Sequence, residues 1–138
     1  MSEKYYIDTC IWKDYLENRS DKFRPLGDWA LRLINKIIKE DGLFIFSDHL
    51  IIELEKQYSA EKINDLLGII PKKLVNKIDT KEEQAKEALY LKNKLDIPFG
   101  DALHAVLARD NNAVLVSRDK HFYELTKEVS IAKPEDLI

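Results

Sequence analysis

The sequence predicts an α/β protein in which helices cover both faces of a central, mainly parallel sheet, that is, a three-layer αβα sandwich. Three short segments at 5–7, 43–46 and 113–116 are continuously apolar, as expected for strands that are buried on both faces. Helical patterns separate these segments, which indicates strand–helix–strand units with parallel strands. At 138 residues, the chain is expected to form a single domain over residues 1–138.

The first half of the chain is predicted to run strand, helix, helix, strand, helix. The strands are short and rich in aromatic and β-branched residues, whereas the long second helix repeats apolar residues three and four positions apart. Ser47 or Asp48 is expected to cap the third helix, which carries Glu53. The five elements are expected at residues 5–7, 9–16, 29–38, 43–46 and 48–54.

The second half begins with the least regular pattern, at residues 59–79, where a short helix around residues 66–67 is followed by breakers and an ambiguous apolar run. Thr80 with Glu83 fits a capping box and predicts a helix to about residue 95. Another helix, from Asp101 to about Asp110, is apolar nearly all round and is expected to be buried. The third strand follows at 113–116, and a weaker fourth strand is expected at 129–131.

Composition limits the classes of protein to consider. The net charge of −3 does not indicate a nucleic-acid binder, so a polyanion would have to meet a local patch or a cation. The three histidines lack the spacing of a zinc site, and the single cysteine, Cys10, is expected to pack in the core. No apolar run approaches the roughly 20 residues that span a bilayer. Without a secretory signal at its start, the chain is expected to be cytoplasmic.

Four acidic residues occupy corresponding places in this plan. Asp8 follows the first strand, Glu53 lies on the helix after the second, Asp101 opens the helix before the third, and Asp119 lies just beyond the third strand. Because parallel strands present their carboxyl ends at one edge of the sheet, the four side chains are expected to converge there. For each acid alone, a solvated surface group, a helix cap or a turn residue is the simpler interpretation.

Convergence would have a chemical consequence. Neighbouring carboxylates repel one another and stay ionised at neutral pH only if a cation compensates them. Clusters rich in oxygen suit hard ions such as Mg²⁺ or Mn²⁺, which bind phosphate oxygens and activate water in phosphodiester hydrolysis. The sequence therefore favours a metal-dependent phosphodiesterase. Phosphotransfer proteins of the receiver or haloacid-dehalogenase type also place aspartates at strand ends, but their further acids and lysine are missing here.

The motifs themselves resemble those of the PIN-domain ribonucleases, and among them the VapC-like toxins of type II toxin–antitoxin systems. The resemblance covers essentially the whole chain, and its strongest part is the pair of motifs around Asp101 and Asp119. In order, the matching stretches are YYIDTCIWKDYLENR, SDHLIIELEK, IPFGDALHAVLA and LVSRDKHF.

The resemblance implies a PIN-like fold and a role for each matching residue. Asp8, Glu53, Asp101 and Asp119 become the catalytic, metal-binding acids of a Mg²⁺- or Mn²⁺-dependent endoribonuclease. Three residues would support them by hydrogen bonding, and two cations that flank the last acid are candidates to contact RNA. The supporting residues are Thr9, Ser117 and His104, and the candidate RNA-contacting residues are Arg118 and Lys120.

The resemblance also implies partners. It predicts an RNA substrate, a cognate VapB-like antitoxin and a homodimer, with no membrane association. Two alternatives remain open from the sequence: a housekeeping RNA-processing nuclease of the same fold, and a PIN-like module that binds RNA or protein without cutting it. The intact set of four acids argues against the second alternative.

Overall fold

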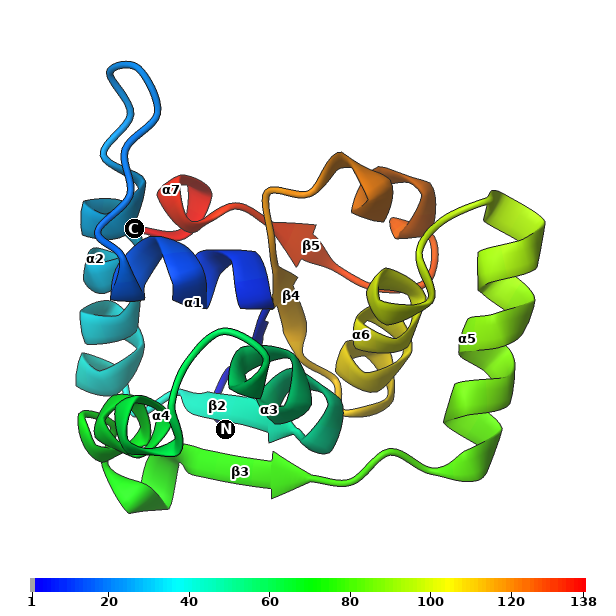
Figure 1. Ribbon diagram of the computed structural model, residues 1–138, viewed down its shortest axis with the longest axis horizontal. Coiled ribbons are helices and arrows are strands. Elements are labelled where there is room, and N and C mark those ends of the chain that lie inside the picture. Colours follow the sequence, from blue (N-terminus) through cyan, green and yellow to red (C-terminus); the bar gives the residue numbers. More distant parts are fainter. Residues whose placement is uncertain (1) are drawn as a thin grey trace.

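A five-stranded sheet forms the centre of the molecule (Figure 1). The structure is a computed structural model and describes residues 2–138. The strand order is β3-β2-β1-β4-β5, and every neighbouring pair is parallel. All strands therefore end at the same edge. Their bounds are β1 Lys4–Ile7, β2 Leu43–Ser47, β3 Val75–Ile78, β4 Val114–Val116 and β5 Ile131–Ala132.

Helices cover both faces of this sheet, as the sequence predicts. Tyr6, Ile45 and Leu115 point from alternate strand positions into a core shared with α5 and α6. Ile7, Phe46 and other strand residues point to the opposite face, where they pack against the helices from α1 to α4. The helices are α1 Thr9–Leu16, α2 Leu26–Lys39, α3 Asp48–Glu55, α4 Ala60–Gly68, α5 Glu82–Leu95, α6 Phe99–Asp110 and α7 Pro134–Leu137.

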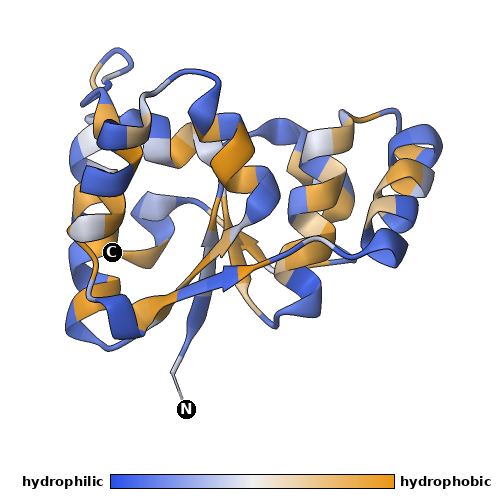
Figure 2. Cartoon of the chain, turned by 60° about the horizontal axis from the view of Figure 1, so that its bottom comes forward, coloured by the Kyte–Doolittle hydropathy of each residue, from blue (hydrophilic) through white to orange (hydrophobic). Residues whose placement is uncertain are grey.

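The amphipathic patterns are visible in the hydropathy of the folded chain. In Figure 2, apolar and hydrophilic stretches alternate along the helices, as they do when one side of a helix packs on a sheet. The helix with the most apolar sequence, α6, is almost wholly enclosed, with every residue from Ala102 to Ala108 buried. None of the described helices combines the length and the apolar composition needed to cross a membrane.

Two local predictions are wrong, and one stretch that the sequence left ambiguous is now assigned. The capping box lies one residue later than predicted: the backbone N–H of Lys81 donates to the side chain of Gln84, while Thr80 donates to Asp48. The ambiguous run before it contains the edge strand β3, whose sequence VNKI has two exposed polar residues at its centre. The last strand, β5, begins at Ile131, so the part of the predicted segment that precedes it is loop.

Candidate functional site

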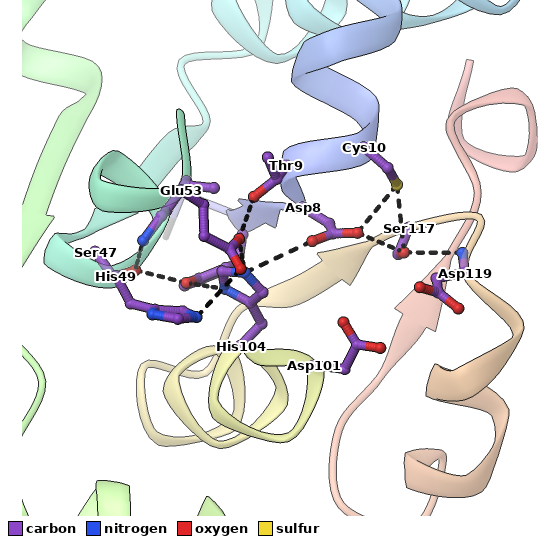
Figure 3. Close-up of polar contacts among 12 residues, drawn as sticks. Asp8, Thr9, Cys10, Ser47, His49, Glu53, Asp101, His104, Ser117 and Asp119 are labelled. Carbon is purple, nitrogen blue, oxygen red and sulfur yellow. Dashed lines mark hydrogen bonds and ion pairs between the residues drawn. The ribbon is translucent and has the colours of Figure 1, made fainter. Parts of the chain in front are cut away.

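Four predicted acids line one pocket at the carboxyl edge of the sheet. The cavity measures about 260 Å³, and Figure 3 shows its acidic side chains between the ends of β1 and β4 and the helices α3 and α6. The acids thus come from four separate segments: the end of β1, helix α3, helix α6 and the loop after β4. The pocket is lined by Asp8, Thr9, Cys10, Lys13, Glu53, Lys56, Gln57, Asp101 and Asp119.

Asp8 occupies the centre of this arrangement (Figure 3). Its extended backbone ends β1 and begins α1, and its N–H donates to the carbonyl of Val116 on the neighbouring strand (2.9 Å). One carboxylate oxygen, Oδ2, accepts hydrogen bonds from Ser117 Oγ and Cys10 Sγ, both at 3.0 Å. Ser117 Oγ also accepts the backbone N–H of Asp119 (3.0 Å), so one hydroxyl links two of the acids.

Cys10 corrects an expectation from the sequence. The thiol lines the pocket and is only partly buried, so it is not simply a core residue. Burial, together with the negative charge of Asp8, raises the pKa of Cys10 well above its ordinary value. The protonated thiol therefore acts as a hydrogen-bond donor to Asp8 and not as a nucleophile.

Glu53 is held in the ionised form. Oε1 accepts hydrogen bonds from Thr9 Oγ1 (2.5 Å) and His104 Nε2 (2.6 Å), and Oε2 lies 3.4 Å from His49 Nε2. Burial alone would raise the pKa of Glu53, but the hydrogen bond from His104 and the closeness of His49 outweigh it and place the pKa far below the ordinary value. Glu53 is therefore a fixed negative charge.

His104 anchors that charge from the core. Its side chain is only 1% exposed, and its Nδ1 lies 2.6 Å from the hydroxyl of Tyr6, which in turn lies 2.6 Å from Ser47 Oγ. Burial opposes the charged ring, yet Glu53 and Asp8 together raise the pKa of His104 above 6.5. Both ring nitrogens then donate, and the imidazolium pairs with Glu53. Ser47 also caps α3 by accepting the N–H of Leu50 (3.0 Å), as predicted.

Asp101 and Asp119 form the second part of the pocket, with His121 between them. The Nδ1 atom of His121 lies 3.1 Å from Asp101 Oδ2 and 3.1 Å from Asp119 Oδ1. Asp101 lies in the first turn of α6, two residues after its start, so it does not cap the helix. Asp119 caps the short 3₁₀ helix η2, Lys120–Leu125, by accepting the N–H of His121 (2.9 Å). Burial, reinforced by the charges of Asp119 and Asp8, raises the pKa of Asp101 to about 6.

A sequence profile described as PIN domain matches residues 5–128 of the chain. The chain belongs to the PIN domain family. No curated protein is similar enough in sequence to count as a match.

Solved structures with the same fold include toxin–antitoxin proteins. VapBC2 from Rickettsia felis, bound to a promoter DNA fragment, superposes with a TM-score of 0.68 at 19% identity, over 94% of this chain and 98% of that one. VapBC-1 from nontypeable Haemophilus influenzae superposes with a TM-score of 0.67 at 18% identity, over 96% of this chain and 98% of that one. Mycobacterium tuberculosis VapC20, a sarcin–ricin loop cleaving toxin, superposes with a TM-score of 0.63 at 16% identity, over 88% of this chain and 94% of that one. At these identities the likeness shows the fold.

The acidic pocket of this PIN domain fits a hard divalent cation. Donor atoms of Asp101, Asp119 and His121 lie within 4.8 Å of one another, which is compatible with ligation of one ion. Burial is the main cause of the raised pKa of Asp101, and the charges of Asp119 and Asp8 add to it; a bound cation would offset both effects. Carboxylate oxygens are the preferred ligands of Mg²⁺ and Mn²⁺. Asp8, Glu53, Asp101 and Asp119 would hold such an ion or ions.

The two cations expected to contact RNA differ in their surroundings. Lys120 is exposed. Arg118, by contrast, is 14% exposed; it bonds Glu135 (2.7 Å), lies 3.6 Å from Asp14 and covers the ring of Trp29. Its Nη1 atom is thus engaged by Glu135, whereas Nε and Nη2 are buried without a hydrogen-bond partner in the described part of the chain. Lys120 is therefore the more accessible of the two candidates for contact with RNA.

Several residues at the site have no assigned role in the sequence prediction. Lys13 and Lys56 line the pocket and can meet phosphates, but no local motif distinguishes them from other surface lysines. His49 lies against Glu53 one helical turn earlier, and the signal was its i,i+4 spacing from that acid. Gly100 permits this packing, because a Cβ atom there would lie 3.0 Å from Glu53 Oε2 and 3.3 Å from His49 Nε2.

Proposed function

We propose that this PIN domain is a Mg²⁺- or Mn²⁺-dependent endoribonuclease that hydrolyses RNA phosphodiester bonds. The observation that carries the proposal is the convergence of Asp8, Glu53, Asp101 and Asp119 on one pocket at the edge of the sheet. Carboxylates gathered in one pocket repel one another, and a bound divalent cation would relieve that repulsion. When bound, the metal would supply an activated water and stabilise charge on the phosphate and the leaving oxygen.

Other side chains of the pocket have two roles: they orient the acids, and they supply positive charge for phosphates. Thr9 and His104 keep Glu53 ionised and oriented, and Ser117 does the same for Asp8 while holding the backbone of Asp119. Lys13 and Lys56 on the pocket wall, with Lys120 outside it, provide positive charge for the flanking phosphates of a bound strand. Because the pocket is open and lies at the surface edge, we expect a single-stranded or looped RNA segment to be the substrate.

Activity is tested with purified protein and a mixed RNA pool. We expect cleavage with Mn²⁺ or Mg²⁺ and none with excess EDTA. Asp119→Asn removes one acid and should lower the rate at least about 100-fold, as expected when charge stabilisation in an active site is lost. The matched control is Asp65→Asn, an exposed acid on α4 that is absent from the pocket. Equal cleavage by Asp119→Asn and wild type would refute the assignment of the acids.

The biological role we propose is that of a toxin in a VapBC-type module. The fold matches to VapBC complexes support this role, and with it we propose a VapB-like antitoxin partner, a homodimer and a cytoplasmic location. Induced expression of the chain should arrest growth, and co-expression of a small neighbouring gene should relieve the arrest. The Asp119→Asn protein, expressed to the same level, should be harmless. Unimpaired growth with the wild-type chain would instead favour the housekeeping nuclease.

A further inference from the structure

A second group of metal donors lies beside the carboxylate pocket, on its α3 side. His49, Glu53 and His104 each offer one ligand atom, and these atoms lie within 4.8 Å of one another. Figure 3 shows the two imidazole rings on the same side of the Glu53 carboxylate, and their centroids are 4.7 Å apart. Unlike the pocket acids, this group consists of two nitrogen donors and one oxygen donor.

His49 is the member of the group whose Nε2 atom has a long contact, 3.4 Å to Glu53 Oε2, in place of a hydrogen bond. Its Nε2 atom is buried, yet it makes no hydrogen bond with any residue in the described part of the chain. The side chain as a whole is 20% exposed, and a T-shaped contact with Phe99 holds its ring. A buried ring nitrogen costs free energy unless it is satisfied, and an ion shared with the facing carboxylate would satisfy this one.

The spacing fits tetrahedral coordination. Two donors that each lie about 2.1 Å from a zinc-like ion at a tetrahedral angle are about 3.4 Å apart. The distance from His49 Nε2 to Glu53 Oε2 is 3.4 Å. The contact of 2.6 Å between His104 Nε2 and Glu53 Oε1 is shorter than this separation and must open, as it would when the ion replaces the shared proton.

The hydrogen bonds of His104 suit it to act as a metal ligand. Its Nδ1 lies 2.6 Å from the hydroxyl of Tyr6, and that hydroxyl lies 2.6 Å from Ser47 Oγ. Nε2 faces Glu53, and a metal ion that displaces the Nε2 proton would leave Nδ1 bonded to Tyr6. Such a partner behind the ring is the usual support of a ligating histidine.

The geometry points to a binding site for a transition-metal dication of the zinc class, formed by His49, Glu53 and His104. Imidazole nitrogens favour Zn²⁺, Co²⁺ or Ni²⁺ over Mg²⁺, which prefers oxygen. Because Glu53 belongs both to this site and to the carboxylate pocket, a zinc-class ion withdraws it from the pocket. Micromolar Zn²⁺ should therefore inhibit cleavage supported by Mg²⁺. That inhibition rests on the proposed function, whereas the binding of the ion does not.

Binding is tested on the metal-free, full-length chain with Co²⁺ as a spectroscopic probe and with Zn²⁺ in calorimetry. We expect visible absorption bands of a nitrogen-coordinated Co²⁺ ion that saturate at one equivalent. Loss of a residue that hydrogen-bonds to a metal ligand lowers metal affinity about 10–100-fold, and loss of a ligand itself lowers it further. His49→Gln should therefore weaken Zn²⁺ binding at least about 100-fold. The matched control is His121→Gln, which alters the other histidine-containing group, Asp101, Asp119 and His121, and should leave the bands unchanged.

A measurement on the wild-type protein avoids any effect of substitution on folding. One equivalent of Zn²⁺ should shift the ring nitrogen NMR signals of His49 and His104, and leave those of His121 in place. Shifts confined to His121, or Zn²⁺ affinity in His49→Gln within twofold of wild type, would overturn the inference. RNA cleavage with Mg²⁺ would persist in that case, so failure of the zinc site is distinguishable from failure of the nuclease assignment.

Discussion

Asp101→Asn should abolish metal-dependent cleavage and, at the same time, make the metal-free protein more stable at neutral pH. The loss of activity, at least about 100-fold, follows from the removal of a carboxylate that a cation needs. The gain in stability follows from the environment of Asp101, where burial and the charges of Asp119 and Asp8 raise its pKa to about 6. A site built to bind a cation is strained when the cation is absent.

The pH dependence of this effect has a definite sign. A carboxyl group whose pKa is raised on folding binds its proton more tightly in the folded state, so ionisation destabilises the fold. This cost is absent below the ordinary pKa of 3.8 and complete above about 6. A pKa moved by that amount corresponds to about 3 kcal/mol, and partial hydration reduces it to about 2 kcal/mol. The amide of the Asp101→Asn variant is uncharged in both the folded and the unfolded state, so the variant does not bear this cost.

Thermal unfolding in EDTA measures the difference. Asp101→Asn should unfold at a higher temperature than wild type at pH 7.5 and at the same temperature at pH 4. Saturating Mn²⁺ should raise the unfolding temperature of wild type and leave that of the variant nearly unchanged. Asp65→Asn, on an exposed face of α4, should match wild type throughout. A variant less stable than wild type at pH 7.5 would contradict the electrostatic account.

Glu53→Gln should have the opposite effect on stability. It leaves the buried His104 ring, 1% exposed, without the carboxylate that balances its charge. The amide oxygen can still accept a hydrogen bond, and Asp8 lies 3.8 Å from the ring, so the loss falls below that of a fully broken buried pair. We expect the free energy of unfolding to decrease by about 2 kcal/mol in the metal-free protein.

This loss should be largest in a limited pH window. The pKa of Glu53 is lowered on folding, so its contribution is complete above its ordinary value of 4.5 and declines below it. The pKa of His104 is raised, so its contribution is complete below 6.5 and declines as pH rises further. Denaturant unfolding of wild type and Glu53→Gln should therefore differ most between pH 4.5 and 6.5. Glu55→Gln, exposed on the same helix, is the control and should cost less than about 0.5 kcal/mol. A uniform loss at every pH would argue against an ion pair.

The sequence predicted the layers of the fold because its apolar patterns are strong. β1, β2 and β4 are continuously apolar and could be assigned without their neighbours. The convergence of the four acids then followed from parallel topology, since each acid lies close to a strand end. β3 escaped prediction because an edge strand with exposed Asn76 and Lys77 has neither a continuous nor an alternating apolar pattern.

Features that depend on side-chain packing across the fold were not predictable in this way. Cys10 Sγ contacts Ser117 Oγ at 3.7 Å, although the two residues are 107 positions apart in sequence. The burial of Arg118 against Asp14, Glu135 and Trp29 likewise requires α1, α2 and α7 to meet. The sequence alone predicts a core environment for Cys10 and a surface environment for Arg118. The assembled fold places Cys10 at the pocket wall as well as against the core, and it largely buries Arg118.

The central claim is that Asp8, Glu53, Asp101 and Asp119 form one cation site. A crystal structure of the wild-type protein grown with Mn²⁺, with anomalous scattering to locate the ion, tests this claim most directly. We predict an anomalous peak in the pocket, about 2.1 Å from carboxylate oxygens of at least two of the four acids. A saturated crystal in which the pocket holds no anomalous peak, or in which the ion contacts none of these carboxylates, would contradict it.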